Sequence, residues 1–354
     1  MIINDSMEDN KVDEIVWRLL KHFGDMPVEN MGGYVAECLG NTVDMSLILR
    51  RLVEIATART QLKALLNTPQ VPQRSEEWYE MRRGRLTASA VAQAFGKGKF
   101  GTKDSLMFSK AFPELDAPFN SMGCAPLRHG IILEDMTGRC YSQRLGDLRI
   151  HNFGMIPHPT MDCFGASPDG INELGIMVEI KTPYKRRVDN NVPFEYALQM
   201  QGQMEVCGLT ECDFVDANIK MDYRNVDEYL KVASGNTDHG LIVEYMVDGV
   251  NTFDYSPEYL TANECIAWGE EQRTIRQTKM PMLFWKLQKI CIKRVKFEKE
   301  NWKEIAPKIE EFWRDVLELR KKGPEGRQTK VAKQKGMTAP QERFEFIDSD
   351  SDSD

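Results

Sequence analysis

The stretch that most restricts the fold is "GASPDGINELGIMVEIKTP", residues 165–183. Two short runs rich in β-branched side chains are separated by turn-forming residues, which is typical of a β-hairpin. Side chains alternate between the faces of a strand, so the second run divides into Ile176, Val178 and Ile180 on one face and Met177, Glu179 and Lys181 on the other. The hairpin therefore predicts a core sheet in which a carboxylate and an ammonium project side by side.

The composition is that of a globular chain. Of its 354 residues, 42% are hydrophobic and 28% are charged, and the length allows one large domain with additions or two modest domains. No apolar run approaches the roughly 18 residues that span a bilayer. The start, "MIINDSMEDNK", lacks the basic and apolar regions of a signal peptide. We therefore expect a soluble, intracellular protein that does not bind membranes.

Eight cysteines are scattered along the chain without a CxxC pair or a Cys/His spacing typical of zinc sites. This pattern argues against a structural zinc site and against an iron–sulfur cluster. We expect the cysteines to be reduced thiols in a reducing compartment.

The net charge of -8 hides an uneven distribution. The last thirteen residues hold six acidic side chains, whereas basic runs occur at residues 82–85, at residues 185–187 and from Lys293 onward. Such runs can line one nucleic-acid groove if the fold brings them to one face. They are equally typical of unrelated solvated faces, and their positions in the sequence leave both interpretations open.

The chain divides into three regions. Apolar periodicity predicts amphipathic helices over residues 10–24 and 42–67, which we assign to an N-terminal helical region, residues 1–70. The prolines of "NTPQVPQRS" indicate a linker, and a larger α/β unit follows over residues 71–322. Residues 323–354 are polar and basic and then consist of Asp-Ser repeats, so we predict that they are disordered.

Two short helices are expected after the linker. Ser75 can cap the first, "EEWYEMRR", which stops at Gly84. The second, "LTASAVAQAFG", has Thr87 as its candidate N-cap and Gly96 as its terminator. The N-terminus of the second helix therefore lies only a few residues after Gly84.

Helical and strand-like segments alternate in the rest of the chain. Helical periodicity covers residues 126–145, "FEYALQMQGQMEVCG" and "NWKEIAPKIEEFWRDVLELRKK". Strand-like segments are residues 150–156, the opening hairpin, "CDFVDANI", "HGLIVEYMVDG" and "LFWKLQKICIKRVKF". The pattern predicts an α/β fold in which helices flank a central mixed sheet.

Asp169, Glu179 and Lys181 alone are a weak signal, because charged residues are common on an outer sheet face. Glu134 strengthens it, since this residue falls within the apolar stripe of the helix over residues 126–145. A lone buried carboxylate is unfavourable unless it is paired or bound to metal. Three converging acids would repel one another, and a divalent cation removes the conflict. Oxygen ligands favour Mg²⁺ or Mn²⁺, with two ions in the site.

Such a site is suited to phosphodiester hydrolysis. A metal ion held by Asp169 and Glu179 would lower the pKa of a bound water and polarise the phosphate, and a second ion would stabilise the leaving oxygen. Lys181 would position the attacking water and stabilise negative charge in the transition state.

The helix in "FEYALQMQGQMEVCG" contains three glutamines. Its apolar side includes Gln201, so we expect this glutamine to face inward and Gln199 and Gln203 to point elsewhere. A core glutamine with satisfied hydrogen bonds is the alternative interpretation of Gln201.

Several motifs match a known family in order and spacing. "SPDG", followed after eight residues by "EIK", resembles the PD-(D/E)XK nuclease signature. Together with "WYEMRRGRLTAS", "HGIILE" and "YALQMQGQMEVCG", it resembles the YqaJ-type viral recombinase, or phage lambda exonuclease-like, family over roughly residues 73–215. The resemblance implies a restriction-endonuclease-like α/β core and a Mg²⁺-dependent deoxyribonuclease. Its implied activity is the 5' to 3' degradation of linear duplex DNA to 5'-mononucleotides in viral recombination, repair or replication.

The family pattern also implies roles for individual residues. Those carried over are metal ligands at Asp169 and Glu179, a second-site acid at Glu134, a catalytic lysine at Lys181, a supporting glutamine at Gln201, 5'-phosphate contacts at Arg82 and Ser89, and DNA-backbone contacts at Arg186 or Arg187. Ser89 fits this role because it lies in the first turn of an expected helix, where free amides favour an anion. Arg82 fits because a guanidinium offers a bidentate fork.

The implied partners are duplex DNA with a free end, a single-strand annealing protein and further copies of the chain in a ring-shaped trimer. The chain has three parts that the compact family pattern lacks: the N-terminal helices, a long segment at residues 220–280 and the acidic tail. Such additions can block the contacts between subunits, so the sequence leaves open whether the chain forms the trimer. The larger size resembles relatives in large eukaryotic DNA viruses. The compartment would then be the host cytoplasm, a virus factory or the nucleus.

Two other functional classes remain open from the sequence. One is a structure-specific endonuclease on the same fold, which would not require a free 5' end. The other is a DNA-binding protein that has the fold without catalysis, although the three acids and the lysine are all present. A protein-interaction role is open only for residues 1–70 and the tail.

Overall fold

A seven-stranded mixed sheet forms the centre of the fold, which is seen in a computed structural model that describes residues 7–23, 45–99, 101–116, 121–221, 223, 225–233 and 238–327. In spatial order its strands are β2 (Ile150–His151), β5 (Gly170–Asn172), β6 (Met177–Lys181), β7 (Glu211–Lys220), β10 (Met282–Lys296), β8 (His239–Val247) and β9 (Val250–Tyr255). β6 and β7 run parallel, and every other neighbouring pair is antiparallel. The predicted α/β class with a central mixed sheet is therefore confirmed.

A small second sheet lies beside the main one. It consists of β1 (Leu86–Thr87), β4 (Phe164–Ala166) and β3 (Ile156–Pro157), in the order β1-β4-β3. β1 is parallel to β4, with Leu86 opposite Phe164, so this sheet joins the segment after α4 to the segment before the β5–β6 hairpin.

Most of the predicted helices are present with small shifts at their ends. The helix expected over residues 87–96 is instead a 3-10 turn followed by a four-residue helix, and helices that the sequence did not predict cover Lys103–Ala111, Val226–Ala233 and Ala262–Ile275. The α-helices are α1 (Met7–Phe23), α3 (Met45–Leu66), α4 (Glu76–Arg83), α5 (Val91–Ala94), α6 (Lys103–Ala111), α7 (Ala125–Arg144), α8 (Phe194–Cys207), α9 (Val226–Ala233), α10 (Ala262–Ile275) and α11 (Lys299–Lys322). Ser75 caps α4 as predicted, because its side chain accepts a hydrogen bond from the amide of Trp78 at 3.2 Å. Short 3-10 turns cover Ala88–Ala90, Pro113–Leu115, Ser121–Gly123 and Pro324–Arg327.

Strand β6 separates two hydrophobic cores, of which its alternating sequence predicted only the one formed by its isoleucines and valine. Ile176, Val178 and Ile180 pack with α1, α3 and α7 on one side of the sheet. Met177 packs with α5, α8 and α11 on the other side, where Phe214 of β7 is also buried. Both faces of the strand are covered, so the charged residues of β6 do not lie on an outer sheet face.

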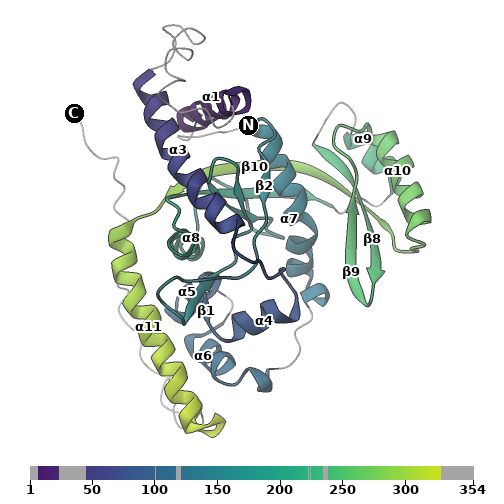
Figure 1. The fold of residues 1–354 in the computed structure, drawn as a ribbon. Helices are drawn as coiled ribbons and strands as arrows, with labels where there is room; N and C mark the ends of the chain where they lie inside the picture. The colour runs from purple at the N-terminus through teal and green to yellow at the C-terminus, as the bar shows by residue number, and fades with distance from the viewer. Residues whose placement is uncertain are drawn as a thin grey trace.

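The segment over residues 220–280 forms an addition at one edge of the sheet. Figure 1 shows β8 and β9 together with α9 and α10 at the right of the view, beyond α7. The predicted strands "CDFVDANI" and "HGLIVEYMVDG" are confirmed as β7 and β8, and "LFWKLQKICIKRVKF" lies in β10. The long β10 connects this addition to the half of the sheet that contains β5 and β6, since it pairs with both β8 and β7.

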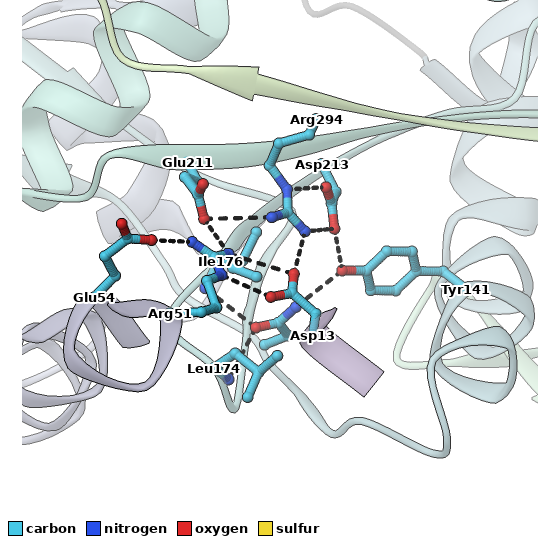
Figure 2. Close-up of polar contacts among 10 residues, drawn as sticks. Asp13, Arg51, Glu54, Tyr141, Leu174, Ile176, Glu211, Asp213 and Arg294 are labelled. Atoms are coloured by element: carbon cyan, nitrogen blue, oxygen red, sulfur yellow. Dashed lines mark hydrogen bonds and ion pairs between the residues drawn. The ribbon is translucent and has the colours of Figure 1, made fainter. Parts of the chain in front are cut away.

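The N-terminal helices are joined to the sheet by a buried ion network, which Figure 2 shows. Arg294 of β10 contacts Asp213 at 2.6 Å, Asp13 of α1 at 2.9 Å and Glu211 at 3.3 Å. Arg51 of α3 contacts the same Asp13 at 2.7 Å and Glu211 at 2.5 Å. Two guanidinium groups thus share three carboxylates, and the side chain of Arg294 is only 4% exposed.

The same network reaches the hairpin of β5 and β6. The hydroxyl of Tyr141, on α7, donates to Asp213 at 2.7 Å and accepts from the side-chain amide of Asn172 at 2.9 Å. The side-chain oxygen of Asn172, Oδ1, accepts hydrogen bonds from the backbone amides of Leu174 and Ile176 in the turn between β5 and β6. A continuous chain of polar contacts therefore connects α1 and α3 to this hairpin.

The remaining expectations concern the C-terminal tail, membrane-spanning helices and the cysteines. Residues 328–354, the larger part of the tail predicted to be disordered, lie outside the described residues. Within the described ranges, no helix is both long and apolar enough to cross a membrane. The cysteines that the structure describes are free thiols, as predicted.

Candidate active site

Asp169 and Glu179 are brought together by the β5–β6 hairpin. Asp169 directly precedes β5, and the antiparallel register places Gly170 opposite Val178. The carboxylate of Asp169 accepts a hydrogen bond from the backbone amide of Ile180 at 2.8 Å, which fixes it beside β6. A side chain at position 170 would lie 2.2 Å from the Cγ2 atom of Ile150, so only glycine allows β2 to approach here.

Lys181 supplies the positive charge between these two acids. Its ammonium contacts Glu179 Oε1, donates to the carbonyl oxygen of Ile180 at 3.1 Å and lies 3.9 Å from Asp169 Oδ2. Burial disfavours the charge, but Glu179 and Asp169 outweigh it and raise the pKa of Lys181. Lys181 is therefore protonated at neutral pH, and three oxygens surround one cation.

Glu179 is completely buried and is held by two glutamines of α8. Gln199 donates to Glu179 Oε1 at 2.7 Å, and Gln203 donates to Oε2 at 2.8 Å. These bonds reduce the cost of burying the carboxylate. The amide oxygen of Gln203 is buried, and within the described part of the chain no donor reaches it.

The orientation expected for the α8 glutamines is wrong. Gln201 points away from the acids: it donates to the carbonyl of Lys296 and accepts from the amide of Glu298, both at 2.8 Å. It is a satisfied core glutamine between β10 and α11, whereas Gln199 and Gln203, four residues apart on one helix face, contact Glu179. The pattern failed because both faces of α8 are buried, so no polar stripe marks its solvent side.

Glu134 lies at the margin of the buried face of α7 rather than within it. Its side chain is 35% exposed and lies 3.6 Å from Arg74. The buried face of α7 runs instead through Ile132, Leu133, Met136, Cys140 and Tyr141. Burial nevertheless raises the pKa of Glu134, although the charges of Arg74 and Lys181 lower it.

A cleft of about 770 Å³ joins Glu134 to Asp169. Its walls come from α7, from residues 70–74 and from residues 251–258 of the added β8–β9 segment. Burial and the neighbouring Glu179 raise the pKa of Asp169 well above its usual range. The charges of Glu179 and Lys181 also act on Glu134, so the three acids and the lysine form one electrostatic group.

The three acids do not form a ready-made metal cage. Across the described ranges, no three His, Cys, Asp or Glu side chains meet closely enough to hold an ion. Asp169 and Glu179 share the ammonium of Lys181, while Glu134 contacts Arg74. The residues still fit a divalent cation in two respects: two carboxylates and the Ile180 carbonyl already face one positive charge, and the Gln203 oxygen beside them lacks a donor.

Arg82 and Ser89 lie on either side of β1. The guanidinium of Arg82 stacks over the ring of Trp78 at 4.4 Å, and the indole of Trp78 donates to Ser167 Oγ at 3.0 Å, two residues before Asp169. Ser89 is exposed, and its hydroxyl lies 3.2 Å from that of Thr87. The helix expected at Thr87 is only a 3-10 turn followed by the four-residue α5, and Thr87 makes no capping hydrogen bond.

The arginines after β6 differ from each other. Arg186 makes two hydrogen bonds of 2.7 Å to Asp216, a fully buried carboxylate. Arg187 is exposed to solvent. Arg186 is thus held by an internal partner, and only Arg187 keeps the exposure that the expected DNA-backbone contact requires.

A protein-family model matches the region of the chain that contains this site. Residues 77–212 match the family model described as the YqaJ-like viral recombinase domain. An uncharacterized protein of Acanthamoeba polyphaga mimivirus is 24% identical over 306 residues, which cover 73% of this chain and 55% of that protein. The chain therefore spans about half the length of this relative.

Two solved structures are also similar to this chain. LHK-Exo in complex with dAMP has a TM-score of 0.43 and 20% identity, with 70% of this chain and 95% of that chain covered. A second structure of LHK-Exo, an alkaline exonuclease from Laribacter hongkongensis, has a TM-score of 0.43 and 21% identity, with 73% and 99% covered.

Proposed function

We propose that this chain, whose residues 77–212 match the model of the YqaJ-like viral recombinase domain, is a metal-dependent deoxyribonuclease that degrades linear duplex DNA from its 5' ends. One observation carries the proposal: the carboxylates of Asp169 and Glu179 face the ammonium of Lys181, while two buried glutamines orient Glu179. Burying these charged side chains costs desolvation free energy, and a sheet with a purely structural role would not need them. The viral recombinase domain supports a role in recombination, repair or replication of a viral genome.

The side chains have distinct tasks in this proposal. Asp169 and Glu179 would hold a Mg²⁺ or Mn²⁺ ion, and Glu134 would contribute to a second site. Bound metal supplies a water of lowered pKa and polarises the phosphate. Lys181, which stays protonated, would orient the water and stabilise negative charge on the phosphate oxygens.

The glutamines keep the carboxylate in place. Gln199 and Gln203 fix both oxygens of Glu179, so the carboxylate does not have to reorganise when substrate arrives. The free oxygen of Gln203 can accept a hydrogen bond from a water at the site.

The function is tested with end-labelled linear duplexes that carry a 5'-phosphate. With Mg²⁺, the protein should release 5'-mononucleotides, and a chelator should stop release. A covalently closed circle of the same sequence is the control, because an exonuclease requires an end. Cutting of the circle as fast as the linear duplex would favour the structure-specific endonuclease, and no hydrolysis of either substrate would favour a non-catalytic DNA-binding protein.

The glutamine assignment gives a separate prediction. Gln203→Leu should lower the cleavage rate about 10- to 100-fold, the range found when a group that orients a metal ligand is removed. Gln201→Leu should leave the rate of the folded protein unchanged and lower the free energy of unfolding by about 1–3 kcal/mol, because the Lys296 carbonyl and the Glu298 amide lose their partner. Initial rates and urea unfolding of both variants distinguish the roles; a larger rate loss for Gln201→Leu would reverse them.

A further inference from the structure

Arg74, in the segment between α3 and α4, has a backbone conformation that an arginine rarely adopts. Its φ angle is +67°, in the left-handed region that favours glycine, asparagine and aspartate. A side chain such as arginine destabilises the fold in this conformation, which persists only where the surrounding structure determines it. Residues of this kind are concentrated at active sites and ligand-binding sites. The position of the Arg74 side chain therefore bears on its role.

The residues on both sides of Arg74 are held in place by hydrogen bonds. The side-chain amide of Gln73 donates to the carbonyl oxygen of Phe153 at 2.8 Å and to that of Pro168 at 3.4 Å. Pro168 directly precedes the aspartate of the proposed metal site. On the other side, Ser75 caps α4. Arg74 is therefore fixed at its backbone close to the β5–β6 hairpin, and its unfavourable φ is imposed by its neighbours.

The side chain of Arg74 lies in the cleft that joins Glu134 to Asp169. It is half-exposed, and its guanidinium is 3.6 Å from the carboxylate of Glu134. This separation is too long for a strong hydrogen bond, and a partly exposed ion pair holds its partners weakly. Arg74 can therefore leave Glu134 for another anion without a large loss of free energy.

The described residues that line the cleft carry more negative than positive charge. Two of them are arginines, Arg74 and Arg139, and four are acids, Glu134, Asp135, Asp169 and Glu258. The guanidinium of Arg139 lies over the ring of Tyr255 at 5.4 Å, on the wall formed by the added β8–β9 segment. Arg74 instead faces the acids of the proposed metal site. A phosphodiester in this cleft would be repelled by the carboxylates unless cations contact it.

We propose that Arg74 contacts a non-bridging oxygen of the phosphodiester that is cleaved, and is thus a further catalytic residue. The inference rests on the proposed nuclease function. When the phosphate enters the cleft, the guanidinium would turn from Glu134 to the phosphate oxygen. A guanidinium offers two parallel donors to phosphate oxygens, and its fixed charge would stabilise the negative charge of the transition state. This role explains why an arginine occupies a position where glycine would be unstrained.

Arg74→Gly should separate catalysis from stability, because glycine removes both the guanidinium and the left-handed strain. With saturating Mg²⁺ and linear duplex, kcat should fall about 10²-fold or more, as when one donor to a transition-state oxyanion is lost. The urea midpoint of unfolding should stay the same or rise. Gln277→Gly is the matched control, because Gln277 lies two residues after α10, outside the set that lines the cleft, and also has a positive φ of +51°. This control should change the urea midpoint in the same direction and keep the wild-type kcat.

Arg74→Lys distinguishes the charge from the backbone. Lysine keeps the positive charge and the strain but lacks the two-donor fork, so this variant should recover part of the kcat lost in Arg74→Gly. A wild-type kcat in Arg74→Gly would overturn the inference and leave Arg74 as a counter-ion of Glu134 alone. Equal losses of kcat in Arg74→Lys and Arg74→Gly would overturn it as well, because the charge would then have no effect.

A binding measurement tests the phosphate contact without turnover. In an Asp169→Asn background, the logarithm of the association constant for duplex DNA should fall linearly with the logarithm of the salt concentration. Adding Arg74→Gly should reduce the slope by about 0.9, the value for one phosphate contact, and adding Gln277→Gly should leave it unchanged. An unchanged slope with Arg74→Gly would overturn the inference even if wild type is a nuclease. If wild type cleaves no DNA, the proposed function fails, and the slope still shows whether Arg74 contacts a phosphate.

Discussion

Asp169→Asn is expected to lower the rate of DNA cleavage by about 10³-fold or more while binding of duplex DNA is largely retained. The substitution removes the charge of a metal ligand but keeps an oxygen that can accept the hydrogen bond from Ile180. Metal ions contribute several kcal/mol to the stabilisation of a phosphoryl transition state, and each ~1.4 kcal/mol corresponds to a tenfold change in rate. Single-turnover cleavage of a labelled duplex and a binding titration measure the two effects separately.

Glu258→Gln is the matched control for this result. Glu258 lines the same cleft as Asp169 but belongs to the added β8–β9 segment. The Glu258→Gln variant should therefore cleave DNA at close to the wild-type rate. Equal losses in both variants would mean that the cleft responds to its overall charge, and the specific role of Asp169 would have to be abandoned.

Arg294→Met is expected to reduce the free energy of unfolding by about 3–5 kcal/mol, the cost of removing one partner from a buried ion pair. Asp213 and Asp13 are nearly inaccessible, and without Arg294 they lose bonds of 2.6 and 2.9 Å. Arg51 still contacts Asp13, but among the described residues Asp213 has no other cationic partner. Urea unfolding measures the change.

Arg276→Met serves as the control for the ion network. Arg276 pairs with Asp254 at 2.7 Å on the surface, where its side chain is 40% exposed. Its loss should not change the unfolding midpoint measurably. Equal stability of Arg294→Met and wild type would show that the buried network does not hold the fold together.

The network also bears on residues 1–70, for which a separate interaction role was open. Deletion of residues 1–66 removes Asp13 and Arg51 and exposes the core side chains of β6 that pack on α1 and α3. We therefore expect the shortened chain to unfold at a lower urea concentration and to lose activity in proportion.

The fold was predictable where a short pattern determines it. The alternation in β6 predicted that Ile176 and Val178 share one core face, which is confirmed, whereas the second core that buries Met177 was not predicted. Ser75 was identified as an N-cap from its spacing alone. The contact between Asp13 and Arg294 was not predictable, because 281 positions separate two residues that no local period connects.

The site was predictable to the extent that one hairpin builds it. Asp169 and Glu179 belong to the same β5–β6 hairpin, so their proximity follows from the pairing of its strands. Gln199 and Gln203 were missed because α8 is buried on all sides; their i, i+4 spacing was the available signal.

Calorimetric titration with Mn²⁺ tests the central claim most directly, because it reports on the carboxylates without requiring turnover. Wild type and Glu258→Gln should bind the ion with the same affinity, and Asp169→Asn should lose most of this binding. Binding of Mn²⁺ by Asp169→Asn as tightly as by wild type would contradict the assignment of Asp169 as a metal ligand and with it the proposed mechanism.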